Sequence, residues 1–155
     1  MLERDQLTSG TTWHAAGLVS QLGPTAAVTK IRKYTLDLYK KLEKEVDHSA
    51  GLRLNGALSI AQTQSRWQEL QRQATTAQLY DVDIKILTKE LIKKDYPMMD
   101  VEDLKGGILM PGDGAADPSG VTHMLAKGAR QLGAKIFEKS RVETILTRNG
   151  KVHGV

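Results

Sequence analysis

The sequence predicts a mixed α/β fold (α and β elements interspersed, α+β in part) for its 155 residues. Segments whose apolar residues recur at intervals of three and four alternate with short runs rich in β-branched residues, which indicates helices interleaved with strands. Local start and turn signals agree with this reading. Asp117-Pro118 is typical of a helix start, and Asn149-Gly150 is typical of a two-residue hairpin turn. A chain of this length can form one ordinary domain with a real core.

The composition is that of a folded globular protein, with 40% hydrophobic and 26% charged residues. The formal charge is +4, but basic and acidic residues are interleaved along the helical stretches and aromatic residues make up only 5%. A nucleic-acid-binding module is therefore the weakest reading. The chain has no cysteine, which excludes disulfides, thiolate metal sites and thiol catalysis. No apolar run approaches the roughly 20 residues of a membrane span, so we expect no membrane partner.

The first third of the chain predicts a strand end, a loop and a long helix. Leu2-Glu3 has the character of a strand end, and residues 5–23 are rich in Gly, Ser and Thr, with a helical turn expected around residues 14–18. A helix is expected from Pro24-Thr25 to about residues 46–48. Its apolar stripe has the spacing of a core-facing helix and comprises Val28, Ile31, Thr35, Leu38 and Leu42.

The middle of the chain predicts two strand-helix pairs. Residues 53–62 alternate as a strand, with Gly56 as a bulge or close-approach point. Residues 64–79 form a helix with an apolar side, and residues 82–86 alternate as a short half-buried strand. Thr88 is expected to cap a short helix that stops before Tyr96-Pro97, because a residue before proline avoids the helical region. The apolar side of the longer helix comprises Trp67, Leu70, Ala74 and Ala77.

The last third predicts a strand, a well-marked helix and a hairpin. Residues 106–110 are a strand candidate, followed by a loop at 111–116. Asp117 caps a helix that has Pro118 at its first position and ends at Gly133, where a left-handed cap is expected. Residues 134–137 and 142–147 are predicted strands. The second of them leads through the turn at Asn149-Gly150 into a strand at residues 152–155.

The stretch LERDQLTSGTTWHAAGL, residues 2–18, closely resembles the second segment of the sarcosine and dimethylglycine dehydrogenase family. Those proteins are flavoproteins of the glycine-oxidase-like (DAO) superfamily of FAD-dependent oxidoreductases. Three later stretches resemble the same family in order and spacing. They are TLDLYKKLEKEV, YPMMDVEDLKGGILMPGDGAADPSG and GARQLGAKIFEKSRVETI.

The resemblance implies a partial glutathione-reductase-like FAD domain with part of an inserted mixed sheet that faces the substrate. We expect residues 1–155 to form this one partial domain. Compared with the family, it would lack the amino-terminal GxGxxG strand-turn, which would lie upstream of Met1, and the carboxyl-terminal half.

The resemblance also implies contacts with the adenosine of FAD. Glu3 would bind the two ribose hydroxyls, as a carboxylate at the end of the second strand of such a domain can do. Arg4 would lie near the adenine, and the backbone N–H and C=O of Val142 would meet the adenine edge. The alternatives are a solvated strand-end charge for Glu3 and an ordinary buried strand residue for Val142.

In the same way, the resemblance implies that the small residues after position 9 wrap the pyrophosphate, the ribityl chain and the flavin ring. His14 corresponds to the histidine that carries FAD covalently on its 8α carbon, and Trp13 would pack beside the ring. The alternatives are a histidine beside a non-covalent flavin, or a Ser/Thr helix cap that needs no ligand. The expected cofactor-binding residues here are Gly10, Thr11, Thr12, Trp13, His14, Ala15, Ala16, Gly17 and Leu18.

The remaining polar candidates are less specific. Asp117 is expected to act as a helix cap and not in catalysis, while the role of Asp113 stays open. No catalytic residue is assigned within the segment. The scattered residues His48, His123 and His153 lack ligand spacing, so no metal site is expected. The residues Arg53, Asn55 and Ser59 are interpreted equally well as substrate contacts or as ordinary strand residues.

The resemblance implies an FAD-dependent oxidoreductase that oxidises the CH–NH bond of an N-methylated amino acid, such as sarcosine or dimethylglycine, by hydride transfer to flavin. Electrons would pass to an electron-transferring flavoprotein or to oxygen, and tetrahydrofolate would bind only in a longer parent protein. The location would be cytoplasmic in a bacterium and the mitochondrial matrix in a eukaryote. The alternatives are a non-covalent FAD oxidoreductase acting on another amino acid or a 2-hydroxy acid, and a catalytically silent fragment.

Overall fold

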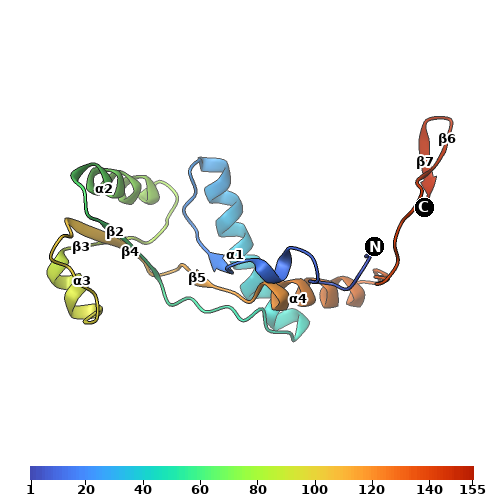
Figure 1. Ribbon diagram of the computed structural model, residues 1–155, viewed down its shortest axis with the longest axis horizontal. Helices are drawn as coiled ribbons and strands as arrows, with labels where there is room; N and C mark the ends of the chain where they lie inside the picture. Colours follow the sequence, from blue (N-terminus) through green and yellow to red (C-terminus); the bar gives the residue numbers. More distant parts are fainter. The chain divides into compact units, whose positions relative to one another are not determined.

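The computed structural model describes residues 1–155 and divides into two compact units. Unit 1 comprises Met1–Gly17, Tyr39–Gly51 and Asp117–Val155, and unit 2 comprises Leu18–Leu38 and Leu52–Ala116. Helix α1 (Ala26–Val46) contributes its first turns to unit 2 and its last turns to unit 1. The elements are labelled in Figure 1.

Unit 2 is built around a three-stranded antiparallel sheet in the order β2-β4-β3. The strands are β2 (Ala57–Ala61), β4 (Gly106–Met110) and β3 (Lys85–Leu87), and Ile108 at the centre pairs with Ser59 and Ile86. The strand at 106–110 is confirmed, whereas β2 is shorter than expected.

The two faces of this sheet are covered by different helices, α2 (Gln64–Gln78) and α3 (Lys89–Asp95), which lie on opposite sides in Figure 1. Ile108 packs with Leu70 under α2, whereas Leu109 packs with the buried Ile92 of α3. This arrangement follows from the alternation of side chains along β4. The predicted apolar side of α2 is confirmed, since Leu70, Ala74 and Ala77 are buried and Trp67 packs against the cluster that contains Leu70 and Ala74.

A second ladder in unit 2 joins β1 (Leu18–Val19) to β5 (Gly114–Ala115). The sequence predicted loops here, because two-residue strands are too short to show an alternation. A separate antiparallel bridge links Arg53 to Ala115. Gly114 permits this close approach, since a Cβ atom at that position would overlap the carbonyl oxygen of Arg53.

Unit 1 is organised by helix α4 (Pro118–Gln131), and its predicted boundaries are confirmed. The Oδ1 atom of Asp117 accepts a hydrogen bond from the N–H of Ser119 at 3.0 Å, and Gly133 has a φ of +88° just after the helix. The core of this unit contains Met124 of α4 together with Val46 and Ala50. The cap expected at Thr88 of α3 is confirmed as well.

The apolar stripe predicted for α1 is wrong in part, because Ile31 is 65% exposed. The buried positions are Thr29, Leu36 and Val46, whose spacings of seven and ten place them on one side of the helix. Thr29 can be buried because its hydroxyl donates to the carbonyl oxygen of Thr25 and accepts from the N–H of Gly23. A polar residue with a local partner thus occupies a core position.

The third predicted strand of unit 2, at residues 82–86, lies later in the chain, at Lys85–Leu87. Val82 is buried but lies outside the strand, and Ile86 is 54% exposed, contrary to its expected half-buried place. The shift follows from the pairing with β4, because Leu87 opposite Gly107 points its side chain into the core beside Ile92.

The strands predicted after α4 form only in part. Residues 134–137 supply a single parallel bridge, between Leu2 and Phe137. Residues 142–145 are not in a strand, because no other strand of the chain pairs with them. The hairpin is confirmed: β6 (Leu146–Arg148) and β7 (Lys151–Gly154) flank the turn at Asn149-Gly150, where both residues have positive φ. None of the helices combines the length and the apolar character that a membrane crossing requires.

Candidate functional site

Glu3 is held at the end of the short parallel bridge between Leu2 and Phe137. Its N–H donates to the carbonyl oxygen of Phe137 at 2.8 Å, and its own carbonyl oxygen accepts from the N–H of Ser140 at 2.8 Å. The Oε1 atom accepts from the N–H of Asp5 at 3.0 Å, whereas Oε2 has no partner in the protein. The half-buried carboxylate is therefore fixed at a strand end with one oxygen able to accept hydrogen bonds. The neighbouring Arg4 is exposed and pairs with Asp5 at 2.8 Å.

The segment with the Trp-His pair forms a single 3-10 turn, η1 (Thr12–His14). The expectation of a helical turn at residues 14–18 is wrong, because Ala15 is already extended and Gly17 has a φ of +73°. Figure 1 shows this turn against α4 within unit 1. Thr11 stands at the N-cap position, yet its hydroxyl makes no capping bond. The alternative of an ordinary Ser/Thr helix cap is not what this turn forms.

The side chains of Trp13 and His14 lie against each other on the surface of unit 1. Their ring centroids are 3.8 Å apart at an interplanar angle of 49°, and the indole is 62% exposed. The imidazole is exposed and makes no hydrogen bond within the protein. Both ring nitrogens of His14 are thus accessible to a ligand, and the indole stiffens the orientation of the imidazole through this contact.

The two glycines of the segment have different roles. Gly17 needs to be glycine for its own backbone, because a φ of +73° is strained for other residues. At Gly10, a Cβ atom would meet no other atom within 4 Å. The packing of this chain therefore does not require a glycine at Gly10, and the open space there allows a ligand to approach the backbone.

These features fit an adenine dinucleotide. Within unit 1, the segment offers hydroxyl donors without protein partners at Thr11 and Thr12, a free imidazole at His14 and a carboxylate oxygen at Glu3. Phosphates take hydroxyl and N–H donors, and a ribose diol takes a carboxylate. Ala15 and Ala16 are exposed beside the turn, and Leu18 in unit 2 is 81% exposed.

Val142 does not lie where the sequence placed it. The residue is 42% exposed and belongs to the stretch that pairs with no strand, so it is neither buried nor part of a ladder. Its backbone N–H and C=O are free of ladder hydrogen bonds for the same reason. The contact with the adenine edge stays a prediction.

A separate polar site lies within unit 2, at a cavity of about 540 Å³. We call it the Asp113 cavity. Asp113 is fully buried, and its Oδ1 atom accepts from the backbone N–H of Gln21 at 2.9 Å and from Gln21 Nε2 at 3.4 Å. Its Oδ2 atom is the one buried side-chain nitrogen or oxygen atom that has no hydrogen-bond partner. The cavity is lined by Ser20, Leu22, Gly23, Pro24, Glu69, Arg72, Gln73, Thr76, Met110 and Asp113.

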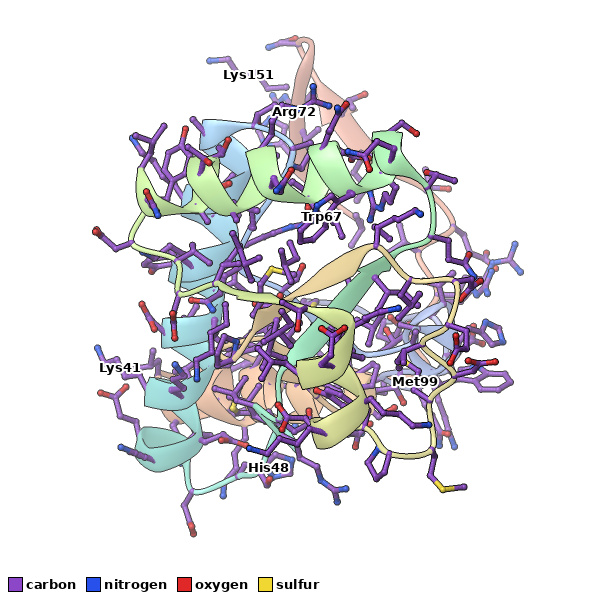
Figure 2. The ribbon with its side chains drawn as sticks, turned by 90° about the vertical axis from the view of Figure 1, so that its left-hand side faces the viewer. Lys41, His48, Trp67, Arg72, Met99 and Lys151 are labelled. Atoms are coloured by element: carbon purple, nitrogen blue, oxygen red, sulfur yellow. The ribbon has the colours of Figure 1, made fainter.

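The wall from α2 carries charges of both signs. Glu69 accepts from Arg66 at 2.8 Å and from Gln73 at 3.1 Å, and the hydrogen bond from Arg66 lowers the pKa of the Glu69 carboxyl below its ordinary value. Arg72 makes no salt bridge. It lies on the side of α2 away from Trp67 in Figure 2, and its positive charge also contributes to lowering the pKa of Glu69.

The sequence did not reveal this cavity. The sequence leaves the role of Asp113 open and gives no signal for Gln21, because their hydrogen bond joins residues 92 positions apart. Asp117 is a helix cap, as expected. The residues Arg53, Asn55 and Ser59 do not line the Asp113 cavity. No three acidic or histidine side chains converge in the way that a metal ion needs.

Comparison with known proteins places these features in a family context. The family model described as "DAO: FAD dependent oxidoreductase" matches residues 1–155. The chain is 38% identical over 146 residues to the mitochondrial sarcosine dehydrogenase of Homo sapiens, with 94% of this chain and 16% of that protein covered. It is 37% identical over 155 residues to the formaldehyde-forming 4-methylaminobutanoate oxidase of Paenarthrobacter nicotinovorans, with 100% of this chain and 19% of that protein covered.

A solved structure shows the same fold. The L-proline dehydrogenase of P. horikoshii superposes with a TM-score of 0.87 at 25% identity, over 97% of this chain and 40% of that one. The predicted mixed fold of the FAD-dependent oxidoreductase type is therefore confirmed. The chain spans less than a fifth of the length of the two relatives named above.

Proposed function

The chain belongs to the DAO family of FAD-dependent oxidoreductases, and we propose that it forms part of an enzyme that oxidises the CH–NH bond of an N-methylated amino acid. Sarcosine and dimethylglycine are the leading substrates. The support is that relatives at 38% and 37% identity are named for the oxidation of methylated amines. Because the chain covers less than a fifth of those proteins, the reaction is proposed for the protein of which this segment is a part.

The observation that carries the proposal is the exposed Trp13–His14 pair, whose imidazole makes no hydrogen bond within the protein. We infer that Gly10–Leu18 binds FAD, with Thr11 and Thr12 donating to phosphate oxygens. Glu3 would accept from the ribose hydroxyls, with Arg4 and the backbone of Val142 near the adenine. When bound, FAD supplies the acceptor for the hydride that leaves the substrate carbon.

His14 is the proposed point of covalent attachment to the flavin 8α carbon. Attachment requires a ring nitrogen with a free lone pair, and neither nitrogen of His14 is engaged in a hydrogen bond. The contact with the indole of Trp13 would orient the imidazole before attachment. A protein-bound flavin would not be lost between turnovers.

The proposed partners are a small methylated amine and, as electron acceptor, an electron-transferring flavoprotein or oxygen. Tetrahydrofolate is proposed only for a longer parent protein. The compartment would be the mitochondrial matrix if the source is a eukaryote and the cytoplasm if it is a bacterium. The human relative is named as mitochondrial, which supports a mitochondrial location if the source is a eukaryote.

Covalent flavin can be tested on a denaturing gel. After expression with FAD, the protein band is expected to fluoresce under ultraviolet light, and the variant His14→Ala should lose that fluorescence. His153→Ala is the matched control, because this histidine is also exposed but lies on the β6–β7 hairpin. Fluorescence that persists in His14→Ala would contradict the assignment. Flavin released entirely by acid would favour a non-covalent flavoprotein, and colourless protein would favour a catalytically silent segment.

A second candidate function is a non-covalent FAD oxidoreductase acting on another amino acid or on a 2-hydroxy acid. The likeness to L-proline dehydrogenase, with its TM-score of 0.87, favours it. The acid-release experiment separates the two candidates, because a non-covalent flavin leaves with the supernatant while a covalent one stays with the precipitated protein.

A further inference from the structure

The chain contains two asparagines, Asn55 and Asn149, and a glycine follows each of them. In an Asn-Gly pair, the backbone nitrogen of the glycine can attack the side-chain amide carbon of the asparagine, because glycine has no side chain that hinders the approach. Asparagine is counted among the thermolabile residues of proteins. The two pairs are identical in sequence but lie in different units, so their surroundings in the structure decide which of them can react.

The pair Asn149-Gly150 forms the exposed turn of the β6–β7 hairpin in unit 1. The side-chain amide of Asn149 makes no hydrogen bond within the protein, and the N–H of Gly150 has no acceptor there. A Cβ atom at Gly150 would meet no other atom within 4 Å. Neither hydrogen bonds nor neighbouring side chains therefore restrain the attacking nitrogen or the amide carbon.

The hairpin also leaves its backbone free to rotate. The five-membered ring that the attack forms contains the Cα–C bond of the asparagine, so ring closure fixes the ψ angle and the turn has to open first. Strands β6 and β7 pair only with each other, and every residue of β6 is exposed. An isolated two-stranded hairpin is marginally stable in water, and exposed segments of this kind open at a low cost in free energy.

The pair Asn55-Gly56 in unit 2 is held on both sides, although the asparagine itself is exposed. The N–H of Gly56 donates to the carbonyl oxygen of Asp113 at 2.9 Å, so the attacking nitrogen is engaged. Before the pair, Arg53 and Ala115 exchange two backbone hydrogen bonds, at 2.7 and 3.0 Å. Strand β2 begins directly after the pair and is bonded to β4. The backbone of Asn55 cannot rotate into the ring geometry while these bonds persist.

We propose that Asn149 is a site of spontaneous deamidation and that the fold protects Asn55 from the same reaction. The nitrogen of Gly150 forms a bond to the Cγ atom of Asn149, the bond between Cγ and Nδ2 breaks, and Nδ2 leaves as ammonia with the proton of the Gly150 nitrogen. Water then opens the cyclic imide at either of its carbonyl carbons, which gives aspartate or isoaspartate. The net reaction consumes one water, releases one ammonia and needs no oxidant.

The two products have different effects on the hairpin. Aspartate keeps the main chain unchanged, and Asp-Gly is, like Asn-Gly, a preferred pair for this turn. Isoaspartate continues the main chain through its side-chain carbon and so adds one backbone atom to the turn. The pairing of Thr147 with Val152 is then expected to break. Both products place a carboxylate between Arg148 and Lys151, where the unmodified chain has a neutral amide.

The test follows both asparagines in one sample of the protein, kept in mildly alkaline buffer. Cleavage after glutamate releases Asn55 in residues 46–69 and Asn149 in residues 144–155, and mass spectrometry measures the deamidated fraction of each peptide. In the folded protein, Asn149 is expected to react at least about tenfold faster than Asn55, because the hairpin opens more easily than the sheet. In urea, the two rates are expected to agree within about threefold, because both pairs are then in unfolded chain.

Equal rates at the two asparagines in the folded protein would overturn the proposal. A difference that persists unchanged in urea would overturn it as well, since the neighbouring sequence and not the fold would then be the cause. The effect on the hairpin is read from the nuclear Overhauser contact between the α-protons of Thr147 and Val152, which face each other across the ladder. This contact should persist in Asn149→Asp and be lost in the isoaspartate form, once that form is separated by chromatography. A contact kept in the isoaspartate form would contradict the predicted break.

Discussion

The three-stranded sheet of unit 2 and the β6–β7 hairpin of unit 1 were predicted from the same kinds of signal but have different environments. In the sheet, Ile108 is 0% exposed between two strands and beneath α2. In the hairpin, Val152 is 69% exposed, although it is also an apolar residue on a strand with good turn chemistry. Alternation and turn residues therefore indicate where a strand can form, while the neighbouring elements decide whether its apolar side is buried.

The largest effect is expected in the sheet. Ile108→Ala should lower the free energy of unfolding by about 2–5 kcal/mol, because it removes a fully buried side chain beneath α2 and leaves a cavity. Urea unfolding followed by circular dichroism measures it. Ile86→Ala is the matched control, since Ile86 is the direct partner of Ile108 on β3 but is 54% exposed. Similar losses for both residues would mean that strand membership, not burial, sets the cost.

An intermediate effect is expected at the start of α4, where a side-chain helix cap is removed and no strand pairing is involved. Asp117→Ala should lower the free energy of unfolding by about 0.5–2 kcal/mol, because the N–H of Ser119 loses its acceptor. Asp117→Asn should recover most of this loss, since an amide oxygen also caps a helix. The same urea titration applies. If the Asn variant is as damaged as the Ala variant, the carboxylate has a role beyond the cap.

The smallest effect is expected in the hairpin. Val152→Ala should change the free energy of unfolding by no more than about 0.5 kcal/mol, because the side chain is mostly in solvent. Asn149→Ala should cost more than this, since Asn149 has a φ of +52° that alanine adopts poorly. A loss above about 1 kcal/mol for Val152→Ala would show that the hairpin packs against a surface, and would remove the contrast with the sheet.

The same contrast explains which parts of the fold the sequence could predict. Helix ends depend on neighbouring residues, so the caps at Thr88 and Asp117 and the left-handed Gly133 were predicted correctly. Strand β4 was predicted correctly, as a short segment that a turn-rich loop follows directly. The expected strand at 142–147 fails over residues 142–145 because it has no partner there. The predicted apolar stripe of α1 is wrong in part because it did not include Thr29 among the buried residues. Thr29 is buried with its hydroxyl in hydrogen bonds that the residue type alone does not predict.

The candidate sites show the same limit. The Trp13–His14 pair could be singled out from its motif, because the motif is continuous in sequence. Its turn is nonetheless centred nearer the amino terminus than expected, since Ala15 is extended. The Asp113 cavity could not be predicted, because its central hydrogen bond joins residues far apart in the chain. Burial of one carboxylate oxygen is a property of the packed structure, not of any local pattern.

The order β2-β4-β3 has a practical consequence for handling the protein in solution. Only β4 has ladder partners on both sides, so the outer flank of β2 and that of β3 each present unpaired backbone donors and acceptors. The side chains of Ile60 on β2 and Ile86 on β3 are also partly exposed. A free strand edge is the surface along which sheets of separate chains can pair, and Ile86→Lys would introduce charge repulsion along the β3 margin.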